Sequence, residues 1–467
     1  MKTQSYKRWV ILCIVASAAF ILSLQVLPKR RLHEDFERGL REYEQTVVKV
    51  ANTTGELESK EEKYMMFYPH SGLHNQRLSL LNAAMVAGWL NRTLIIPEVN
   101  IATATYWRSS VDLPVKLDTC PDLVAGHRQM EKELGQRVHL PSECFDYRKY
   151  VPVRFTDLFD LSALATVGVR YILRDDLHHS YFQHDPLNIP QNEANQSMVY
   201  KVLDDDRYSY RIYDSDDNAQ PLFNFNRRLT VSELQARPER LLIFNSMFGS
   251  KRLALNDKNK KQLEFLRQSI GILHPIVNSG ADQVISRLGG PGQYVSAHIR
   301  AGDGVFKQHI TETMDKIKAK LDGLVREDSN IKDTEVEQLR MLQLQKTPQS
   351  ISKLLDRCVQ LQNEGGKLTT LFMATDSKDP RNDPNLRTIF DDYVCSFTLQ
   401  DFPDTTKSIK ATSPRDNNTE IGPLLLPLVD AVIASYSKDF VGTQGSTFSG
   451  YVKSRQLALI DRHQSTM

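Results

Sequence analysis

Two side chains that can bind anions stand at the end of one apolar segment. Tyr294 to Gly304 (YVSAHIRAGDG) starts as an apolar and β-branched run, which predicts a buried strand, and ends in a glycine-rich loop. In open parallel sheets ligands bind beyond the carboxyl ends of strands. Arg300 could bind phosphate oxygens there with its planar, permanently charged fork, next to His298. The alternative is a structural ion pair between Arg300 and Asp303.

A second candidate anion site lies in DFVGTQGSTFSGYV, near the C-terminus. An apolar strand runs into Gly442 and Gly445, and a helix then begins with Ser446 or Thr447 as its cap. Free amides at a helix start, together with hydroxyl groups, suit an anion. An ordinary well-capped helix is the alternative.

Polar residues also follow two other predicted strands. Asp376 ends LTTLFMATD, where it either binds a ligand or forms a turn. In the first half, the loop PHSGLHNQR joins a strand to a helix, and Gly72 permits close approach of the backbone. Four polar side chains stand at this loop: His70, His74, Asn75 and Gln76. A solvated connection is the alternative, whereas two facing loops, one from each half, would form a cleft suited to a small molecule.

Parallel α/β sheets are needed to position these segments. The strand that starts at Tyr64, the helix from Arg77 to Asn91 and the strand TLIIP form a βαβ unit. The second half repeats this order, with strands at Tyr294 to Ile299 and Leu368 to Asp376. RYIL and RLLIFN predict two further strands in the middle, and Asp204 to Gln220 predicts an exposed acidic insertion. We therefore expect an α/β fold with two Rossmann-like domains.

The N-terminus differs in kind from the rest. Trp9 to Leu27 contains no charge and is flanked by Lys and Arg, and a run of about 20 apolar residues can cross a bilayer. We predict an uncleaved signal anchor with single-pass type II topology; a cleaved signal peptide is the alternative. The predicted divisions are 1–31 (cytoplasmic tail and anchor), 32–63 (stem), 64–245 (first domain) and 246–467 (second domain).

Composition and cysteines narrow the class of protein. Lys and Arg total 59 against 57 acids, a net charge of +2, which does not favour nucleic-acid binding. Four cysteines follow the anchor, and this even count suits two local disulfides in an oxidising compartment: Cys120, Cys144, Cys358 and Cys395. Four sequons agree with a luminal location: Asn52, Asn91, Asn195 and Asn417. We expect a Golgi or endoplasmic reticulum membrane protein whose catalytic part is luminal.

The same segments resemble a known family. GLHNQRLSLLNAAMVAGWLNRTLIIP is similar to the G-x-N-Q…A…L-N-R-T-L-x-x-P signature of the GDP-fucose protein O-fucosyltransferases, and HIRAGD is similar to their H-x-R-x-G-D/S element. The ATD strand end and DFVGTQGSTFSGYV match two further blocks in the same order. The matching blocks cover Tyr64 to Pro97 and Tyr294 to Arg455.

The resemblance implies a GT-B fold and an inverting transfer of fucose from GDP-fucose to a protein or glycan hydroxyl, with no required metal or other cofactor. Arg300 would neutralise the departing phosphates, Asn75 would lie near the reacting carbon, and Asp430 would bind the guanine. The remaining donor-binding candidates are His298, Ser446, Thr447, Phe448, Asp303, Gly72, Gln76 and Asp376. A relative that binds without catalysis, and a transferase using another nucleotide sugar, are the alternatives.

The sequence departs from the family at one important place. Some members carry a glutamate before the loop glycine, which would be a natural general base, but here this residue is Ser71. Serine cannot take a proton unaided at neutral pH. Either His70 or His74 serves, no side-chain base is used, or activity has been lost. The acidic runs Asp204 to Asp206 and Asp214 to Asp217 could be a metal site of the other glycosyltransferase fold, but we interpret them as solvated surface.

Overall fold

The structure is a computed structural model that describes residues 62–465, except for 103, 149, 175–177, 191–194, 303, 326–331, 365–367 and 413–420. The predicted anchor at Trp9 to Leu27, most of the predicted stem and Asp303 lie outside these residues. Over the described part of the chain, no helix is both long enough and apolar enough to cross a membrane. All the described helices and strands belong to one compact unit, Lys63–Met467.

The first sheet has five parallel strands in the order β5-β2-β1-β9-β6. These strands are β5 (Tyr171–Arg174), β2 (Thr93–Pro97), β1 (Tyr64–Phe67), β9 (Leu241–Phe244) and β6 (Val199–Val202). Both sides of the sheet are covered, so β1, β2 and β9 are apolar runs without alternation. The predicted βαβ unit is confirmed.

Helix α2 (Leu73–Leu90) connects β1 to β2 and begins earlier than the predicted Arg77. The amides of Asn75 and Gln76 donate to the Gly72 carbonyl at 2.9 and 3.0 Å, so the polar residues of the loop already form the first helical turn. The predicted loop side chains are therefore held on a helix start.

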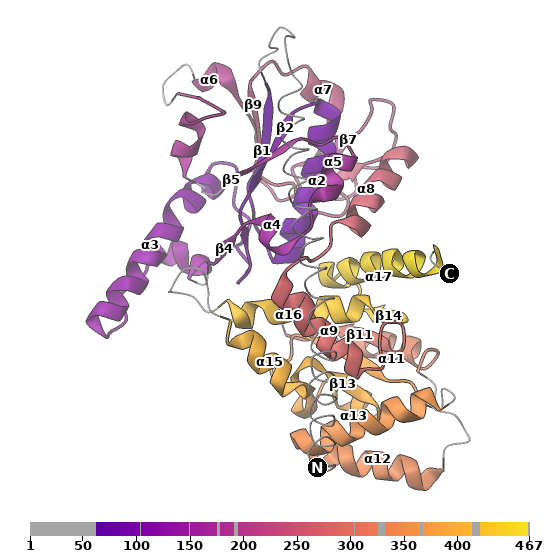
Figure 1. Cartoon of the computed structure of the whole chain (residues 1–467). Coiled ribbons are helices and arrows are strands. Elements are labelled where there is room, and N and C mark those ends of the chain that lie inside the picture. Colours follow the sequence, from indigo (N-terminus) through magenta and orange to yellow (C-terminus); the bar gives the residue numbers. More distant parts are fainter. Residues whose placement is uncertain are drawn as a thin grey trace, which may run out of the picture. The chain divides into compact units, whose positions relative to one another are not determined.

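The second sheet has four parallel strands in the order β13-β12-β11-β14. They are β13 (Ser396–Thr398), β12 (Leu371–Thr375), β11 (Val295–Ile299) and β14 (Asp439–Gly442). Helix α16 (Gly422–Ser435) packs on β11 and β12, α9 (Pro275–Arg287) packs on α16, and α13 (Pro348–Asn363) packs on α9, all in the lower part of Figure 1. Two parallel sheets, consecutive in the chain, confirm the predicted α/β class.

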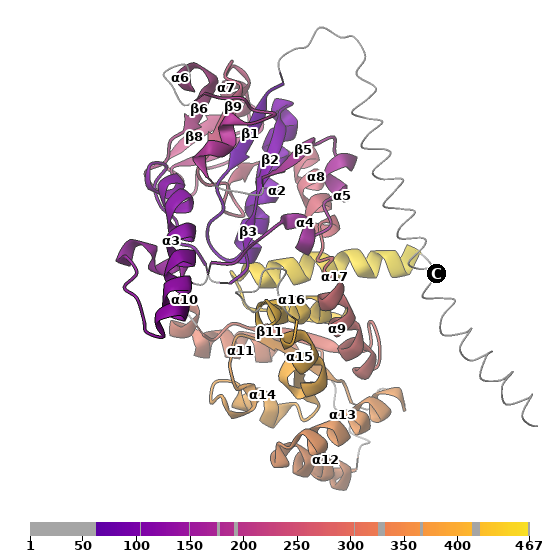
Figure 2. The same ribbon diagram turned by 60° about the vertical axis from the view of Figure 1, so that its left-hand side comes forward.

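The C-terminal helix α17 (Thr447–Ser465) follows β14 of the second sheet but packs on α2 and on α8 (Asp257–Ser269). Figures 1 and 2 both show α17 running alongside elements of the first half. A helix that begins at a strand end of one sheet therefore contacts the helices of the other.

The predicted acidic insertion is wrong at its centre. Tyr210–Tyr213 is a buried strand, β7, between β8 (Arg227–Thr230) and β10 (Leu253–Ala254). Arg211 is only 3% exposed, and its burial is tolerated because its guanidinium donates to backbone carbonyls, including that of Lys251 at 2.9 Å. The charged residues on both sides conceal this strand in the sequence. Strand β10 lies after the predicted domain boundary at 245/246 and pairs with β7, which lies before it. The boundary itself stays a prediction.

The remaining elements complete the fold. Those of the first half are β3 (Val99–Asn100), α3 (Asp112–Leu134), η1 (Ser142–Tyr147), β4 (Pro152–Val153), α4 (Phe155–Leu158), α5 (Ser162–Thr166), η2 (His179–Gln183), α6 (Asn195–Met198) and α7 (Val231–Gln235). Those of the second half are α10 (Gly304–Gln308), α11 (Ile310–Leu321), α12 (Asp333–Gln345), η3 (Pro380–Asn382), α14 (Arg387–Asp392), η4 (Leu399–Asp401) and α15 (Pro403–Lys410).

The two predicted disulfides are confirmed. Cys120–Cys144 joins α3 to η1, and Cys358–Cys395 joins α13 to the residue before β13. Both are local in sequence, with separations of 24 and 37 residues. Each links a helix to a neighbouring segment of the same half.

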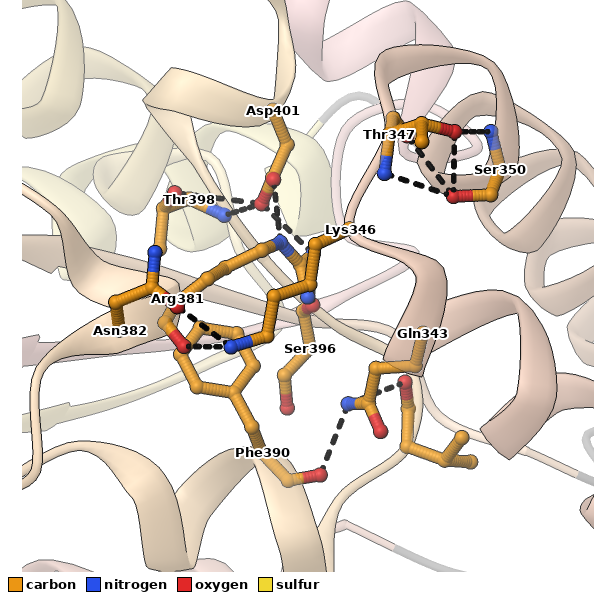
Figure 3. A network of polar contacts seen from close by, with 11 residues as sticks. Gln343, Lys346, Thr347, Ser350, Arg381, Asn382, Phe390, Ser396, Thr398 and Asp401 are labelled. Atoms are coloured by element: carbon orange, nitrogen blue, oxygen red, sulfur yellow. Dashed lines mark hydrogen bonds and ion pairs between the residues drawn. The ribbon is translucent and has the colours of Figure 1, made fainter.

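A polar network holds the outer edge of the second sheet (Figure 3). Arg381 donates from Nε and Nη2 to the two carboxylate oxygens of Asp401, at 2.6 and 3.0 Å, and Asp401 also accepts from the Thr398 amide. Lys346 donates to the Arg381 carbonyl, and Gln343 donates to the Phe390 carbonyl. The end of α12 is thereby fixed to β13 and its flanking turns.

Candidate active site

The end of β11 positions a buried imidazole. His298 Nδ1 is 2.8 Å from Ser449 Oγ, and the ring stacks on Phe448 with the centroids 4.3 Å apart. Burial, helped by the nearby charge of Arg300, lowers the pKa of His298 to about 3. His298 is therefore neutral at physiological pH, and its ring packs between β11 and α17.

Arg300 follows on the same strand end and is half-buried. Its amide donates to Thr443 Oγ1 at 3.1 Å, and Thr443 Oγ1 in turn donates to the His298 carbonyl at 2.8 Å. The guanidinium carbon lies 4.5 Å from the ring centroid of Phe306. The backbone of Arg300 is thus fixed to the loop after β14, which leads directly to α17.

Asp376 supports the loop that carries Arg300. Its carboxylate accepts from the amides of Ala301, at 2.8 Å, and Gly302, at 3.1 and 3.2 Å. A Cβ at Gly302 would lie 2.9 Å from Asp376 Oδ2, so glycine permits this close approach. The structure shows a positioning role for Asp376, and its predicted donor contact stays a prediction.

The predicted helix start after β14 is confirmed. Gly445 adopts a φ of 78°, which a residue with a side chain rarely adopts, and α17 begins at Thr447. Ser446 is 6% exposed, and its Oγ has no hydrogen-bond partner among the described residues. A buried hydroxyl without a partner at a helix start is a group that a bound anion would satisfy.

Gly442 sets the distance between β14 and α17, and replacing it with alanine is expected to be destabilising. The added Cβ would lie 2.6 Å from Ser449 Cβ and 2.7 Å from Ser449 Oγ, the group that holds His298. We expect a loss of about 1–3 kcal/mol in the free energy of unfolding, measured by urea denaturation. Gly450→Ala is the control, because nothing lies within 4 Å of its Cβ position. Equal stability of Gly442→Ala and wild type would contradict this account.

The loop before α2 is tightly held. Ser71 has a φ of 71°, its amide donates to the Thr105 carbonyl at 2.5 Å, and its hydroxyl accepts from Asn75 Nδ2 at 2.7 Å. Gln76 is fully buried and exchanges hydrogen bonds with the backbone of Asn100 in both directions. Gln76 thus fixes the loop, and its predicted donor contact stays a prediction, as does that of Gly72.

His74 brings this loop to the second half. Its ring centroid lies 4.9 Å from that of Tyr451 and 5.4 Å from that of Phe448, both on α17. Burial and the charge of Arg77 lower the pKa of His74 to about 3, and its Nδ1 is enclosed with no partner in the described residues. Asn75 Oδ1 is enclosed in the same way. The first turns of α2 and α17 thus meet at Phe448, and the expected cleft between two facing loops stays a prediction.

Two residues that we did not assign support this contact. Arg77 donates to the carbonyls of Arg267 and Ile270 at 2.6–3.0 Å and lies 4.9 Å from the Tyr451 ring centroid. Tyr451 Oη accepts from the Ile272 amide at 3.0 Å. In the sequence, Arg77 could have been singled out because it directly follows the polar loop residues, whereas nothing in the sequence marks Tyr451.

His70 lies just beyond β1, and its contacts are with residues that follow β9. Its Nε2 is 2.7 Å from Ser246 Oγ beyond β9, and its ring packs on Phe248 at 5.7 Å. Burial, with the charges of Arg207 and Arg252, lowers the pKa of His70 to about 3. Of the two candidate bases, His74 is therefore the one that contacts the second half.

The interpretation of Asp204 as solvated surface is wrong. It is 2% exposed and accepts from Asn245 Nδ2 at 2.6 Å, and burial raises its pKa to about 7. Asp205 and Asp206 are exposed, as expected. Within the described part of the chain, no three His, Cys, Asp or Glu residues are grouped to hold a metal ion.

Asp430 lies on α16. Its Oδ1 is enclosed without a hydrogen-bond partner among the described residues, and burial raises its pKa well above the usual range of a carboxyl. A buried carboxyl whose oxygen accepts no hydrogen bond from the described protein groups is suited to a ligand that donates N–H groups.

Comparisons with known proteins agree with these features. Residues 139–458 match the family model described as GDP-fucose protein O-fucosyltransferase, which includes the β11, Asp376 and α17 segments but not the loop before α2. O-fucosyltransferase 30 of Arabidopsis thaliana is 23% identical over 367 residues, 69% of this chain and 71% of that protein.

Solved structures were compared as well. POFUT1 in complex with GDP matches with a TM-score of 0.38 and 12% identity, over 85% of this chain and 95% of that one. NodZ alpha-1,6-fucosyltransferase soaked with GDP-fucose matches with a TM-score of 0.34 and 12% identity, over 84% and 92% of the two chains.

Proposed function

Since the chain belongs to the GDP-fucose protein O-fucosyltransferase family, we propose that it transfers fucose from GDP-fucose to a hydroxyl of a protein or glycan acceptor, with inversion, in the secretory pathway. The observation that carries this proposal is the convergence of β11, α17 and the loop before α2 around Phe448, which touches both His298 and His74. We extend it to a GT-B arrangement, in which the second sheet binds the nucleotide.

The donor would lie across the strand ends of the second sheet. Asp430 would accept hydrogen bonds from guanine, and Ser446 and the free amides at the start of α17 would bind the pyrophosphate. As the bond between the fucose C1 and the β-phosphate oxygen breaks, negative charge grows on GDP. Arg300 and the helix start would stabilise this charge through preorganised donors, in a mechanism that uses no metal.

The acceptor hydroxyl would attack C1 from the opposite face and lose its proton. His74 is the better candidate of the two histidines for this proton, because its ring contacts Phe448 and Tyr451 on α17. Burial lowers its pKa to about 3 in the free protein, so this role requires the negative charge of the bound donor to raise the pKa. Ser71 is not a competitor, since its hydroxyl accepts from Asn75. Asn75, whose Oδ1 remains without a described partner, would orient the reacting groups.

A donor screen tests the proposal. GDP-fucose and GDP are expected to raise the melting temperature of the purified protein, since a ligand at 100 times its Kd stabilises by about 2.7 kcal/mol. UDP-sugars are expected to have no effect, and GDP-mannose should bind less well than GDP-fucose. GDP release should then follow when a pool of glycoproteins and glycans is added.

Two other outcomes have distinct meanings. If the protein binds GDP but releases none from GDP-fucose with any acceptor pool, this result would favour a relative that binds but does not catalyse. The supporting observation is Ser71, which stands in place of a glutamate and whose hydroxyl accepts a hydrogen bond from Asn75. The absence of a shift with every GDP-sugar would overturn the proposal itself.

A further inference from the structure

Two adjoining cavities flank helix α3. The larger, of about 890 Å³, is lined by α3, by the segment from β4 to α4, and by residues at the starts of α9 and α16. The smaller, of about 610 Å³, lies between α3 and residues 137–148. Val124 and Arg128 line both cavities, so the two are neighbours along one helix. The candidate donor residues Arg300, Ser446 and Asp430 line neither.

The larger cavity contains buried polar atoms that lack partners. Tyr150 is 6% exposed, yet its Oη has no hydrogen-bond partner among the described residues, and the same holds for His274 Nδ1. Tyr150 precedes β4 in the first half and His274 precedes α9 in the second, and both line this cavity. Buried polar groups are normally paired, so these two atoms indicate a ligand with hydroxyl groups or similar partners.

The two cavities differ in charge. Three carboxylates line the larger one, from Glu98, Asp122 and Asp157, together with the guanidinium groups of Arg128 and Arg154. The smaller one is basic, with a single acid, Glu131, against five basic residues or imidazoles: Arg128, Arg137, Arg148, His127 and His139. His127 Nδ1 is a third enclosed atom without a described partner.

We propose that the two cavities form one acceptor groove for an anionic oligosaccharide, with neutral sugar hydroxyls in the larger cavity and a carboxylate or sulfate group in the basic one. Sugar hydroxyls both donate and accept hydrogen bonds, so they satisfy carboxylates, Tyr150 and His274 together. An acidic peptide would satisfy the basic end, but it would bring like charges to Glu98 and Asp157.

The groove also has a suitable place in the fold. Glu98 directly follows β2 of the first sheet, and His274 directly precedes α9, so the larger cavity is lined from both halves. The inference rests on the proposed transferase function, because it assigns the ligand as acceptor. Binding of the oligosaccharide itself, however, can be measured without turnover.

Calorimetry on the full-length protein tests the groove, with a hexamer of five neutral sugars and one terminal uronic acid as the probe. Its methyl-esterified form should bind about tenfold more weakly, because it lacks the charge, and hexaglutamate should also bind more weakly. Arg137→Ala combined with His139→Ala should weaken the hexamer about tenfold. Tyr150→Phe, which removes one hydroxyl, should weaken it about fivefold. A hexamer with one terminal sulfate in place of the carboxylate isolates the type of anion: tighter binding than the uronic acid hexamer would assign the anion to sulfate, and weaker binding would assign it to carboxylate.

Lys132→Ala is the matched control, since Lys132 is an exposed cation on α3 that lines neither cavity. Unchanged GDP affinity in every variant shows that the fold is intact. If the wild-type protein binds the hexamer but does not bind GDP, this result counts against the transferase function and leaves the groove standing. The groove is refuted if the hexamer does not bind, if the ester or hexaglutamate binds equally well, or if the lining variants behave like Lys132→Ala.

Discussion

Arg300→Ala is expected to lower kcat/KM for GDP-fucose about 10²–10³-fold, with little change in melting temperature. Arg300 follows β11 directly, and its backbone position is set by the hydrogen bond from its amide to Thr443 and by the carboxylate of Asp376 under the next two residues. Removing the side chain leaves this scaffold in place. The loss therefore falls on the charge that grows on the departing GDP, where one preorganised donor commonly contributes a factor of this size.

The comparison variants are Arg300→Lys and Lys307→Ala. Lysine keeps the charge but loses the planar fork, so it should recover only part of the activity. Lys307 is an exposed cation on the adjacent α10, and its removal should leave kcat/KM unchanged. Full activity of Arg300→Ala would show that this guanidinium does not act on the leaving group.

Asp430→Asn is expected to weaken GDP binding about 100-fold, because guanine can donate two hydrogen bonds, asparagine keeps one acceptor oxygen, and the one lost hydrogen bond to a charged group contributes about 1.5–3 kcal/mol. The side chain lies on α16, a well-packed helix, and its Oδ1 has no partner among the described residues. The exchange of one oxygen for an amide nitrogen changes the hydrogen bonding and leaves the packing nearly the same.

The pH dependence of GDP affinity provides a further readout for Asp430. Burial raises the pKa of this carboxyl, so the free protein holds it protonated at a pH where an ordinary aspartate is ionised. Guanine N–H groups favour the ionised form, so GDP affinity should rise as the pH rises through the raised pKa. This rise should be absent in Asp430→Asn and present in Asp404→Asn, a change at an exposed position on α15. A pH profile of Asp430→Asn identical to that of wild type would exclude the proposed role.

The strand ends could be predicted because parallel strands buried on both faces have a clear pattern. The run that ends at Phe67 is apolar and the run that ends at Ile299 is mostly so, both are buried throughout, and the polar residues that follow mark the edge where ligands bind. The helix start at Thr447 was equally clear, because glycines precede it and hydroxyl residues lie at it. Candidate residues on these segments were therefore placed correctly in the fold.

The supporting contacts could not be predicted, because they depend on tertiary packing. Nothing in the sequence pairs Ser449 with His298, or Gln76 with the backbone of Asn100, since these partners are far apart or have no periodic pattern. Asp204 misled us for the same reason. An acidic run is usually solvated, but β6, which precedes this run, pairs with β9 and brings Asp204 to Asn245.

The Cys120–Cys144 link has a practical consequence for anyone who produces this protein. It attaches η1 to α3, and the basic cavity lies between that helix and the segment containing η1. Protein with Cys120→Ser and Cys144→Ser would lack this covalent tie but would keep Cys358–Cys395, the strand ends and the α17 start that surround His298. Such a preparation would pass a nucleotide-binding quality check and still fail with the second substrate, so oxidative expression is the condition under which acceptor screens are informative.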